Sequence, residues 1–416
     1  MNDALANGCG PLDGVRVLEA GRFASAPSCA TLLADWGADV IKIEPLSGDP
    51  ARGPGSASAS GESYDGRVNP RFELHNRGRR SLAIDLKLLR GREIVALLLD
   101  RMDVFVTNMR ERALYGLELD WPRLHTRHPR LVYGQITGYG KSPIAVDRAS
   151  YDHGAFWSYS GAAMSFAQSD GSLPQPAGGL GDRATGTALA AGIAAALFDR
   201  ERTSTGRLVN ASLLGAGMWL LGSDASDALA FGHVARPLSR VATKYPTMNC
   251  YRSSDGRWFW LQVMIPEEDW QLLLDAIDAK WIDDDPRFRG GAPAKLAVAG
   301  PALVNILDRI FASRPLEEWN ERFNRYGICF APVLSICEAV QDPVVQESGA
   351  LVDVQTRRGG TTRAVNSPSA FDDITEISQP APHVGEHTAE ILCELGFDDA
   401  MVWQLAESGV VRLGES

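Results

Sequence analysis

Short apolar runs alternate with helical stretches along the first 140 residues, and this alternation is the strongest constraint on the fold. The runs typical of strands are 15–19, 38–43, 104–106 and 131–136. The helical patterns between them are 27–36, which Gly37 closes, and 91–102. Strands that are joined through helices form parallel sheets. The sequence therefore predicts an α/β fold with a parallel sheet in its N-terminal part.

Ligands of such sheets bind beyond the carboxyl ends of the strands, and the loops that begin there are the expected contact points. These loops start at Ala20, Glu44, Thr107 and Thr137. No Gly-x-Gly-x-x-Gly follows the first strand and the chain has no Walker phosphate loop, so both nucleotide fingerprints are absent. Residues 47–69, rich in Gly, Ser, Pro and Asp, are either a surface loop that covers the site or a disordered insertion.

Length and composition narrow the class of protein. The chain has 416 residues, more than the roughly 250 to 300 at which a single core stops growing, so two domains are expected. A net charge of −11 disfavours nucleic-acid binding, and no apolar stretch reaches the roughly 18 residues of a membrane helix. Six scattered cysteines and the absence of signal-peptide features in residues 1–11 predict reduced thiols, no metal and a cytoplasmic protein.

Asp182 lies between glycines in the run 179–186, at the start of a long segment of small residues. Glycines let a ligand approach the backbone closely, and the dipole at the start of a helix favours an ionised carboxylate. A reactive aspartate is presented in this way. An aspartate that only caps the helix fits the same pattern, so these residues alone leave both interpretations open.

The second half of the chain predicts a smaller domain of mixed type. Residues 206–212 resemble a strand that enters a helix at 213–231, and 250–263 predicts a hairpin around an Asp-Gly turn. Further helical patterns are 267–277, 301–311, 316–326 and 389–395. Basic residues cluster at 77–80 and 110–112, where they either bind a phosphorylated small ligand or form a solvated face.

Motifs from end to end of the chain carry a resemblance to a known family; they are 10–19, 36–45, 76–87, 138–140, 181–186, 197–203, 331–333 and 385–388. The chain resembles the class III coenzyme A transferases of the CaiB/BaiF family. That family includes formyl-CoA transferase, carnitine CoA-transferase and, as a divergent branch, α-methylacyl-CoA racemase. The resemblance implies a CoA transferase that uses acyl-CoA and a small carboxylic acid as substrates and holds no permanently bound cofactor.

The family's reaction implies a nucleophilic role for Asp182, which matches the family's reactive aspartate. Its carboxylate attacks an acyl-CoA thioester to give a mixed anhydride, and the CoA thiolate then converts the aspartate into a thioester that an acid resolves. The same resemblance implies CoA contacts at Phe23, Ala24, Arg79, Ile84, Lys87, Asn108, Met109 and Thr137. Asn108 fits a structural turn equally well, and Arg79, Arg80 and Lys87 suit nucleotide phosphates.

Several positions depart from the family pattern. Pro45 stands where some members carry an arginine, and 245–263 lacks the glycine-rich loop of formyl-CoA transferase, which puts formyl-CoA and oxalate in doubt. The racemase needs a Gly-His-Asp triplet, but residues 150–152 read Ser-Tyr-Asp and His153 is displaced. This departure disfavours racemase activity, which would need a register shift that places His153 in the triplet. Racemase activity and a catalytically silent CoA-binding protein are the alternatives to transfer, and the retained Asp182 argues against the silent protein.

The sequence offers a few candidate residues for the pocket that binds the acceptor acid. Aromatic residues are candidates for lining it or for packing in the core; they are Tyr139, Tyr151, Phe156, Trp157 and Tyr159. Arg71 and His75 are candidates for meeting the acceptor's carboxylate, although His75 fits the surface equally well. Neither the donor nor the acceptor is identified.

The family's architecture implies a Rossmann-like large domain, a smaller α+β domain and an interlocked homodimer. The large domain is expected at 1–201 and 395–416, and the small domain at 235–331. The linkers are then 202–234 and 332–394.

Overall fold

The computed structural model describes residues 10–53, 69–145, 147–168, 170–234, 239–264, 266–355, 360–369, 371, 376–377 and 379–414. Most of the loop expected at 47–69 lies outside these residues. The chain divides into two compact units. The first comprises 1–166, 174–226 and 346–416, and the second comprises 167–173 and 227–345. The division into two units does not test the domain and linker boundaries expected from the sequence, which stay a prediction.

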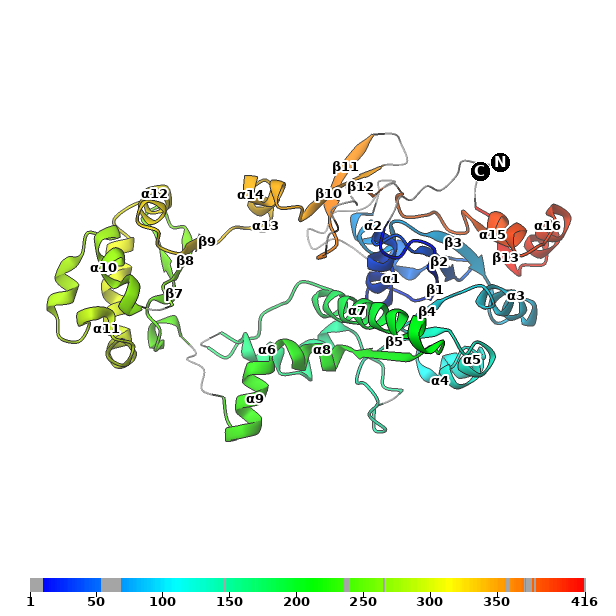
Figure 1. The fold of residues 1–416 in the computed structure, drawn as a ribbon, viewed down its shortest axis with the longest axis horizontal. Helices are drawn as coiled ribbons and strands as arrows, with labels where there is room; N and C mark the ends of the chain where they lie inside the picture. The colour runs from blue at the N-terminus through cyan, green and yellow to red at the C-terminus, as the bar shows by residue number, and fades with distance from the viewer. Residues whose placement is uncertain are drawn as a thin grey trace. The chain divides into compact units, whose positions relative to one another are not determined.

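A seven-stranded sheet forms the centre of the first unit, in the order β13-β3-β2-β1-β4-β5-β6 (Figure 1). Its strands are β1 Arg16–Ala20, β2 Asp39–Glu44, β3 Arg80–Ile84, β4 Val104–Thr107, β5 Val132–Thr137, β6 Leu208–Ser212 and β13 Val411–Arg412. All neighbours are parallel except β13 and β3. Strand order reverses at β1, which pairs with both β2 and β4, and ligands of open α/β sheets bind at such a switch point.

Helices of the first unit connect and cover these strands. They are α1 Ser25–Asp35, α2 Pro70–Asn76, α3 Leu89–Leu99, α4 Glu111–Gly116, α5 Trp121–Arg127, α6 Ala162–Ser165, α7 Leu180–Thr203, α8 Leu213–Leu220, α15 Thr388–Glu394 and α16 Asp399–Glu407, with the short 3-10 helix η1 Pro50–Arg52 and the π-helix η3 His153–Ser158. The unit also contains a small sheet of β10 Leu351–Gln355, β11 Thr361–Val365 and β12 Glu376–Ile377.

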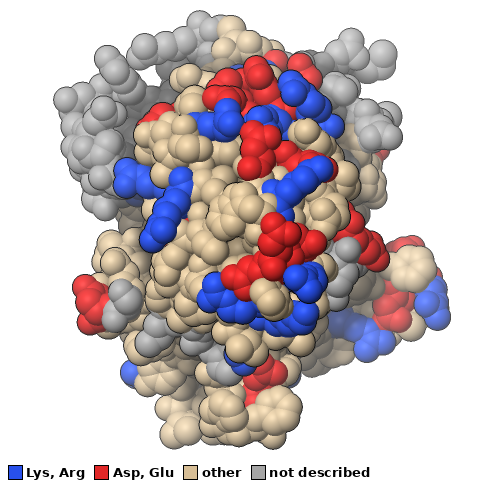
Figure 2. Space-filling view, turned by 90° about the vertical axis from the view of Figure 1, so that its left-hand side faces the viewer, with Lys and Arg blue, Asp and Glu red and all other residues tan. Residues whose placement is uncertain are grey.

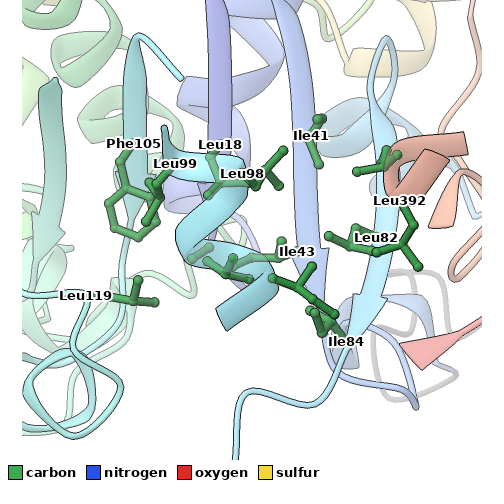
Figure 3. Packing of buried hydrophobic residues seen from close by; sticks show 14 of the residues in the cluster. Leu18, Ile41, Ile43, Leu82, Ile84, Leu98, Leu99, Phe105, Leu119 and Leu392 are labelled. Carbon is green, nitrogen blue, oxygen red and sulfur yellow. The ribbon is translucent and has the colours of Figure 1, made fainter. Parts of the chain in front are cut away.

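Both faces of the large sheet are buried, as parallel sheets require. On one face, Leu98 of α3 lies over strand residues that include Leu18 and Ile41 (Figure 3). On the other face, residues of α1 and α7 share a core cluster with Val17 and Val40. Neighbouring residues of one strand thus enter opposite cores, and each fully buried side chain of this kind stabilises the fold by about 1.5–3 kcal/mol.

The second unit is built on the predicted hairpin. Strands β7 Met248–Arg252 and β8 Trp258–Gln262 are antiparallel, and β9 Phe330–Pro332 extends the sheet. The helices are α10 Pro266–Ala276, α11 Pro293–Phe311, α12 Leu316–Tyr326 and α13 Ile336–Ala339, with turns η4 Arg240–Ala242, η5 Lys280–Asp284 and η6 Arg289–Gly291. Helices α9 Gly222–Phe231 and α14 Pro343–Glu347 cross the boundaries between the units.

Two helix predictions need correction. The helix expected at 213–231 is two helices, because the backbone leaves helical geometry at Leu221 and Gly222 begins α9. Helix α11 begins at Pro293 rather than Pro301, which lies inside the helix. A proline most often stands in the first turn of a helix, and two prolines near one helix made the second the wrong choice. The helix at 316–326 is confirmed with the expected bounds.

The surface charges that Figure 2 displays are mixed, and the lengths and compositions of the helices bear on whether any of them could span a membrane. On the face that Figure 2 displays, basic side chains lie among acidic ones rather than in a large area of one sign. Within the described residues, no single helix has the length and apolar composition of a membrane span. By length and composition only, the bent pair α11 and α12 passes when the two are taken together.

Candidate active site

Asp182 lies in the first turn of α7, where the helix packs closely on η3. Gly179, the residue before the helix, has φ +77°, a backbone conformation that glycine adopts without strain. A Cβ on Gly181 would stand 2.2 Å from the ring carbon Cγ of Phe156. The two glycines therefore let the chain turn and enter the helix against η3, which fixes the position of the carboxylate that follows.

Helix α1 packs against α7, and this places the loop that follows β1 near Asp182. A Cβ on Gly186 would lie 2.8 Å from the carbonyl oxygen of Ser25, so α1 and α7 cross with their backbones close together. A Cβ on Gly179 would lie 3.9 Å from both the Cβ of Ala24 and Oδ2 of Asp182. The switch-point loop of the sheet and the nucleophile candidate are therefore neighbours, although they are far apart in sequence.

The environment of Asp182 overturns one expectation about its charge. The helix dipole was expected to favour the ionised form, but burial first, and then the carboxylate of Asp152, raise the pKa of Asp182 to about 6, with Arg183 opposing them. Desolvation and a like charge disfavour a carboxylate more than the start of a helix favours it. At neutral pH most Asp182 side chains are still ionised, and the raised pKa makes this carboxylate more basic than an ordinary aspartate, as is common at functional sites.

Asp152 is a site residue that sequence reasoning missed. Its side chain is buried, and its Oδ2 accepts a hydrogen bond of 3.0 Å from the N–H of Gly179. Its other oxygen, Oδ1, has no hydrogen-bond partner among the described residues and faces Gly181. The pattern of the triplet 150–152 concerned a histidine, and no local signal in the sequence distinguishes Asp152 from a surface aspartate.

A cavity of about 790 Å³ opens at the carboxyl ends of β1, β2, β3 and β4. Three of the residues expected at the CoA site line it: Ile84, Lys87 and Met109. Pro45 also lines it, and Arg22 and Arg92 add positive charge. Glu44, Asp49 and Asp85 also line it, and the first two are paired with Arg52 and Lys42. The cavity thus combines apolar walls with side chains of both charges at the sheet's switch point, and its cations suit a phosphorylated ligand with an apolar part.

The loop from β1 to α1 is held by side chains from other strands. Asn108 accepts a hydrogen bond from the N–H of Arg22 at 3.0 Å and donates to its carbonyl oxygen at 2.8 Å. These bonds match the turn-fixing interpretation of Asn108. Phe23 has a positive φ of 62°, is about half exposed, and packs edge-to-face on Tyr151. Its strained backbone presents an aromatic ring beside Ala24.

Arg79 does not line the cavity. Its side chain is fully buried, its guanidinium pairs with Glu19, and it donates to the carbonyl oxygen of Pro27 at 3.1 Å. Burial and pairing keep this guanidinium out of the cavity lining, and its contact with a CoA phosphate stays a prediction. Arg80 is likewise paired, with Asp39 and two glutamates of α15.

The remaining expected residues lie in different surroundings. Thr137 ends β5, where its hydroxyl accepts from the N–H of Gly140. His75 is buried, and burial together with nearby arginines lowers its pKa to about 4, so it is neutral at pH 7. Phe156 and Trp157 pack in a small core, whereas Tyr151 and Tyr159 are exposed. Across the described residues, no group of His, Cys, Asp and Glu has the arrangement of a metal site.

Comparisons with known proteins agree with this geometry. CoA-transferase family III matches residues 12–388. The (R)-2-hydroxy-4-methylpentanoate CoA-transferase of Clostridioides difficile is 33% identical over 403 residues, which cover 96% of this chain and 99% of that protein. The cinnamoyl-CoA:phenyllactate CoA-transferase of Clostridium sporogenes is 29% identical over 406 residues, covering 96% and 97%. A solved CAIB/BAIF family protein from Brucella suis has a TM-score of 0.77 at 27% identity, covering 93% and 99%.

Proposed function

The chain belongs to CoA-transferase family III and is a class III CoA-transferase; from this premise, we propose that it moves CoA between carboxylic acids through covalent intermediates on Asp182. The observation that carries the proposal is the position of Asp182. It lies half-buried at the start of α7, beside the loop that leaves the switch point of the sheet. A carboxylate held there stands next to the edge of the sheet where ligands of such folds bind.

In the proposed reaction, each step exchanges one bond for another. The Asp182 carboxylate attacks the thioester carbon, the carbon–sulfur bond breaks, and the thiolate of CoA leaves with the electron pair. The thiolate then attacks the aspartyl carbon of the anhydride, and the donor acid leaves as a carboxylate. The acceptor carboxylate attacks the resulting aspartyl thioester and releases the thiolate, which attacks the acceptor's acyl carbon and regenerates Asp182. One negative charge moves throughout, and no proton is consumed.

The experiment uses the purified chain with cinnamoyl-CoA and 2-hydroxy-4-methylpentanoyl-CoA, without an acceptor acid. Hydroxylamine intercepts an aspartyl thioester or anhydride and leaves a hydroxamate on the attacked side chain. Peptide mass spectrometry is expected to place that hydroxamate on Asp182 with at least one donor. If neither donor leaves a modification on Asp182, while transfer to phenyllactate or 2-hydroxy-4-methylpentanoate still occurs, the covalent role of Asp182 is refuted.

The pH dependence provides a test of the neighbouring carboxylate. We expect kcat/KM for the acyl-CoA to fall below about pH 6 as Asp182 becomes protonated. In Asp152→Asn this fall in kcat/KM is expected at lower pH, because the removed charge no longer raises the pKa of Asp182. The amide oxygen of the asparagine can still accept the hydrogen bond from the N–H of Gly179. Rates between pH 4.5 and 8 measure this. If kcat/KM of Asp152→Asn falls at the same pH as that of the unchanged protein, the electrostatic role of Asp152 is contradicted.

We also propose that the cavity at the ends of β1 to β4 binds the CoA moiety. Lys87 is the exposed cation of this cavity that the family resemblance assigns to CoA. Lys87→Ala is expected to raise the KM for acyl-CoA by about 5- to 20-fold, with the ratio shrinking at high salt. The matched control is Arg90→Ala, an exposed cation outside the cavity that pairs with Glu93. Equal effects of the two variants argue against a phosphate contact.

For the acceptor, we propose a carboxylic acid with an apolar side chain. The two named relatives act, by their names, with 2-hydroxy-4-methylpentanoate and with phenyllactate, which both carry such side chains. The edge-to-face pair Phe23 and Tyr151 offers exposed aromatic surface beside Ala24. Racemisation has less support, since the group that acts on Asp182 is the Asp152 carboxylate, and His153 is exposed.

An interlocked homodimer remains part of the proposal. Trp219 of α8 and Leu229 of α9 are 83% and 88% exposed, which is unusual for large apolar residues. A second copy of the chain is a partner that would cover them. Light scattering of the purified protein distinguishes the mass of a dimer from that of the 45.0 kDa chain.

A further inference from the structure

Two groups of opposite charge lie close to Gly179. A Cβ placed on this residue would lie 3.2 Å from Nη1 of Arg183 and 3.9 Å from Oδ2 of Asp182. The methyl group of Ala24, at 3.9 Å, borders the same point. A side chain at position 179 would crowd the guanidinium, so glycine lets Arg183 and Asp182 both lie close to the backbone here. The cation and the nucleophile therefore border the same point of the chain.

Arg183 differs from the buried arginines around it. Arg77, Arg79 and Arg80 are each paired with a carboxylate within 3.0 Å. The side chain of Arg183 is half-buried, yet among the described residues its guanidinium makes no hydrogen bond and has no carboxylate within ion-pair distance. A partly desolvated guanidinium without an anion binds a carboxylate strongly, through two parallel hydrogen bonds where the geometry permits.

We propose that Arg183 binds the carboxylate of the acceptor acid and directs it to the aspartyl thioester. This inference rests on the proposed covalent role of Asp182. While Asp182 is ionised, the Arg183 guanidinium is near enough to favour its negative charge, and both groups border Gly179. Formation of the aspartyl thioester removes that charge, and the incoming carboxylate replaces it. One acceptor oxygen is held by the guanidinium, and the other attacks the aspartyl carbon as the carbon–sulfur bond breaks and the thiolate leaves.

The proposal separates the two halves of the reaction. The donor arrives as a thioester, which has no carboxylate at its reacting end, so the guanidinium adds little to donor binding. The acceptor arrives as an anion and requires the guanidinium. A neutral nucleophile such as hydroxylamine attacks the same aspartyl carbon without needing a cation beside it. Loss of Arg183 therefore distinguishes acceptors by charge, which a general disturbance of the fold does not do.

The experiment compares Arg183→Gln with the unchanged protein, using the donor that modifies Asp182 and either phenyllactate or 2-hydroxy-4-methylpentanoate. We expect the acceptor KM to rise about 10- to 100-fold, while the donor KM changes less than about threefold. Capture of the thioester by hydroxylamine is expected to proceed at a similar rate in both proteins. Arg183→Lys keeps the charge without the planar fork and is expected to give an intermediate acceptor KM.

Arg202→Gln is the matched control, because Arg202 is exposed near the opposite end of the same helix. An acceptor KM that stays within threefold in both Arg183 variants, with the Asp182 adduct present, overturns the proposal and leaves the covalent mechanism standing. The same holds if hydroxylamine capture falls as much as carboxylate transfer. Absence of the adduct in the unchanged protein refutes the mechanism itself. Should Arg183→Gln fail to fold, the acceptor KM of Arg183→Lys decides.

Discussion

Asp182→Asn is expected to abolish CoA transfer and, at neutral pH, to make the folded chain more stable. Asparagine keeps the shape of the side chain but cannot form an anhydride or a thioester. Removing the nucleophile of a covalent mechanism lowers kcat by a factor on the order of 10⁴ or more. The steady-state transfer rate and the yield of hydroxamate after hydroxylamine treatment measure the loss.

The gain in stability follows from the raised pKa of Asp182. The unfolded chain ionises this carboxyl at its ordinary pKa of 3.8, whereas the folded chain ionises it at about 6. The folded state therefore loses stability as pH rises between these values, and above pH 6 the full cost is present. This cost is on the order of 3 kcal/mol. Asp182→Asn removes it at pH 7, and the advantage over the unchanged protein disappears below about pH 4.

Urea unfolding at pH 7 and at pH 4 measures this difference. Asp147→Asn, at an exposed aspartate outside the site, is the matched control and is expected to change neither activity nor stability by a measurable amount. A transfer rate in Asp182→Asn within tenfold of the unchanged protein would falsify the nucleophilic role. A fully inactive variant that is less stable at pH 7 contradicts the electrostatic account alone.

Glu19→Gln is expected to destabilise the protein by about 3–5 kcal/mol, the usual cost of breaking a buried ion pair from one side. Glu19 is fully buried and accepts from both Lys42, at 3.0 Å, and Arg79. Lys42 also pairs with Asp49 at 3.0 Å and donates to the carbonyl oxygen of Gly21 at 3.0 Å. Losing the glutamate charge leaves Arg79 buried without a carboxylate and loosens the loop after β1, so activity is expected to fall as well.

The double variant Glu19→Leu with Arg79→Met separates stability from ligand binding. Replacing both members of a buried pair by apolar residues is often close to neutral, so most of the lost stability is expected to return. Urea unfolding follows the stability, and the KM for acyl-CoA follows binding. If the double variant is folded and its KM for acyl-CoA is unchanged, Arg79 has a purely structural role. A KM for acyl-CoA raised about tenfold supports the contact between Arg79 and CoA that the family resemblance implies. A loss below 1 kcal/mol in Glu19→Gln is the result that contradicts the prediction for the buried network.

The sequence missed β3 for a physical reason. Arg79 and Arg80 made residues 77–80 resemble a basic surface or a phosphate site, but all five side chains of β3 are buried. Their charges are matched by Glu19, Asp39 and glutamates of α15 that are up to 314 positions away. A charge that is neutralised by a distant residue is indistinguishable, in one sequence, from a charge that faces water or a ligand.

Local patterns by themselves determined much of this protein: the alternation of strands and helices predicted the parallel sheet, and the glycines around Asp182 singled it out as either a reactive aspartate or a helix cap. Both signals depend on residues within a few positions of each other, through side-chain periodicity and backbone freedom. Only the tertiary structure brought Asp152 against the start of α7, buried Arg79 beside Glu19 and left the Arg183 guanidinium, unpaired among the described residues, near the nucleophile. These features depend on which distant groups exclude water from one another, and burial and pairing are properties of the packed chain.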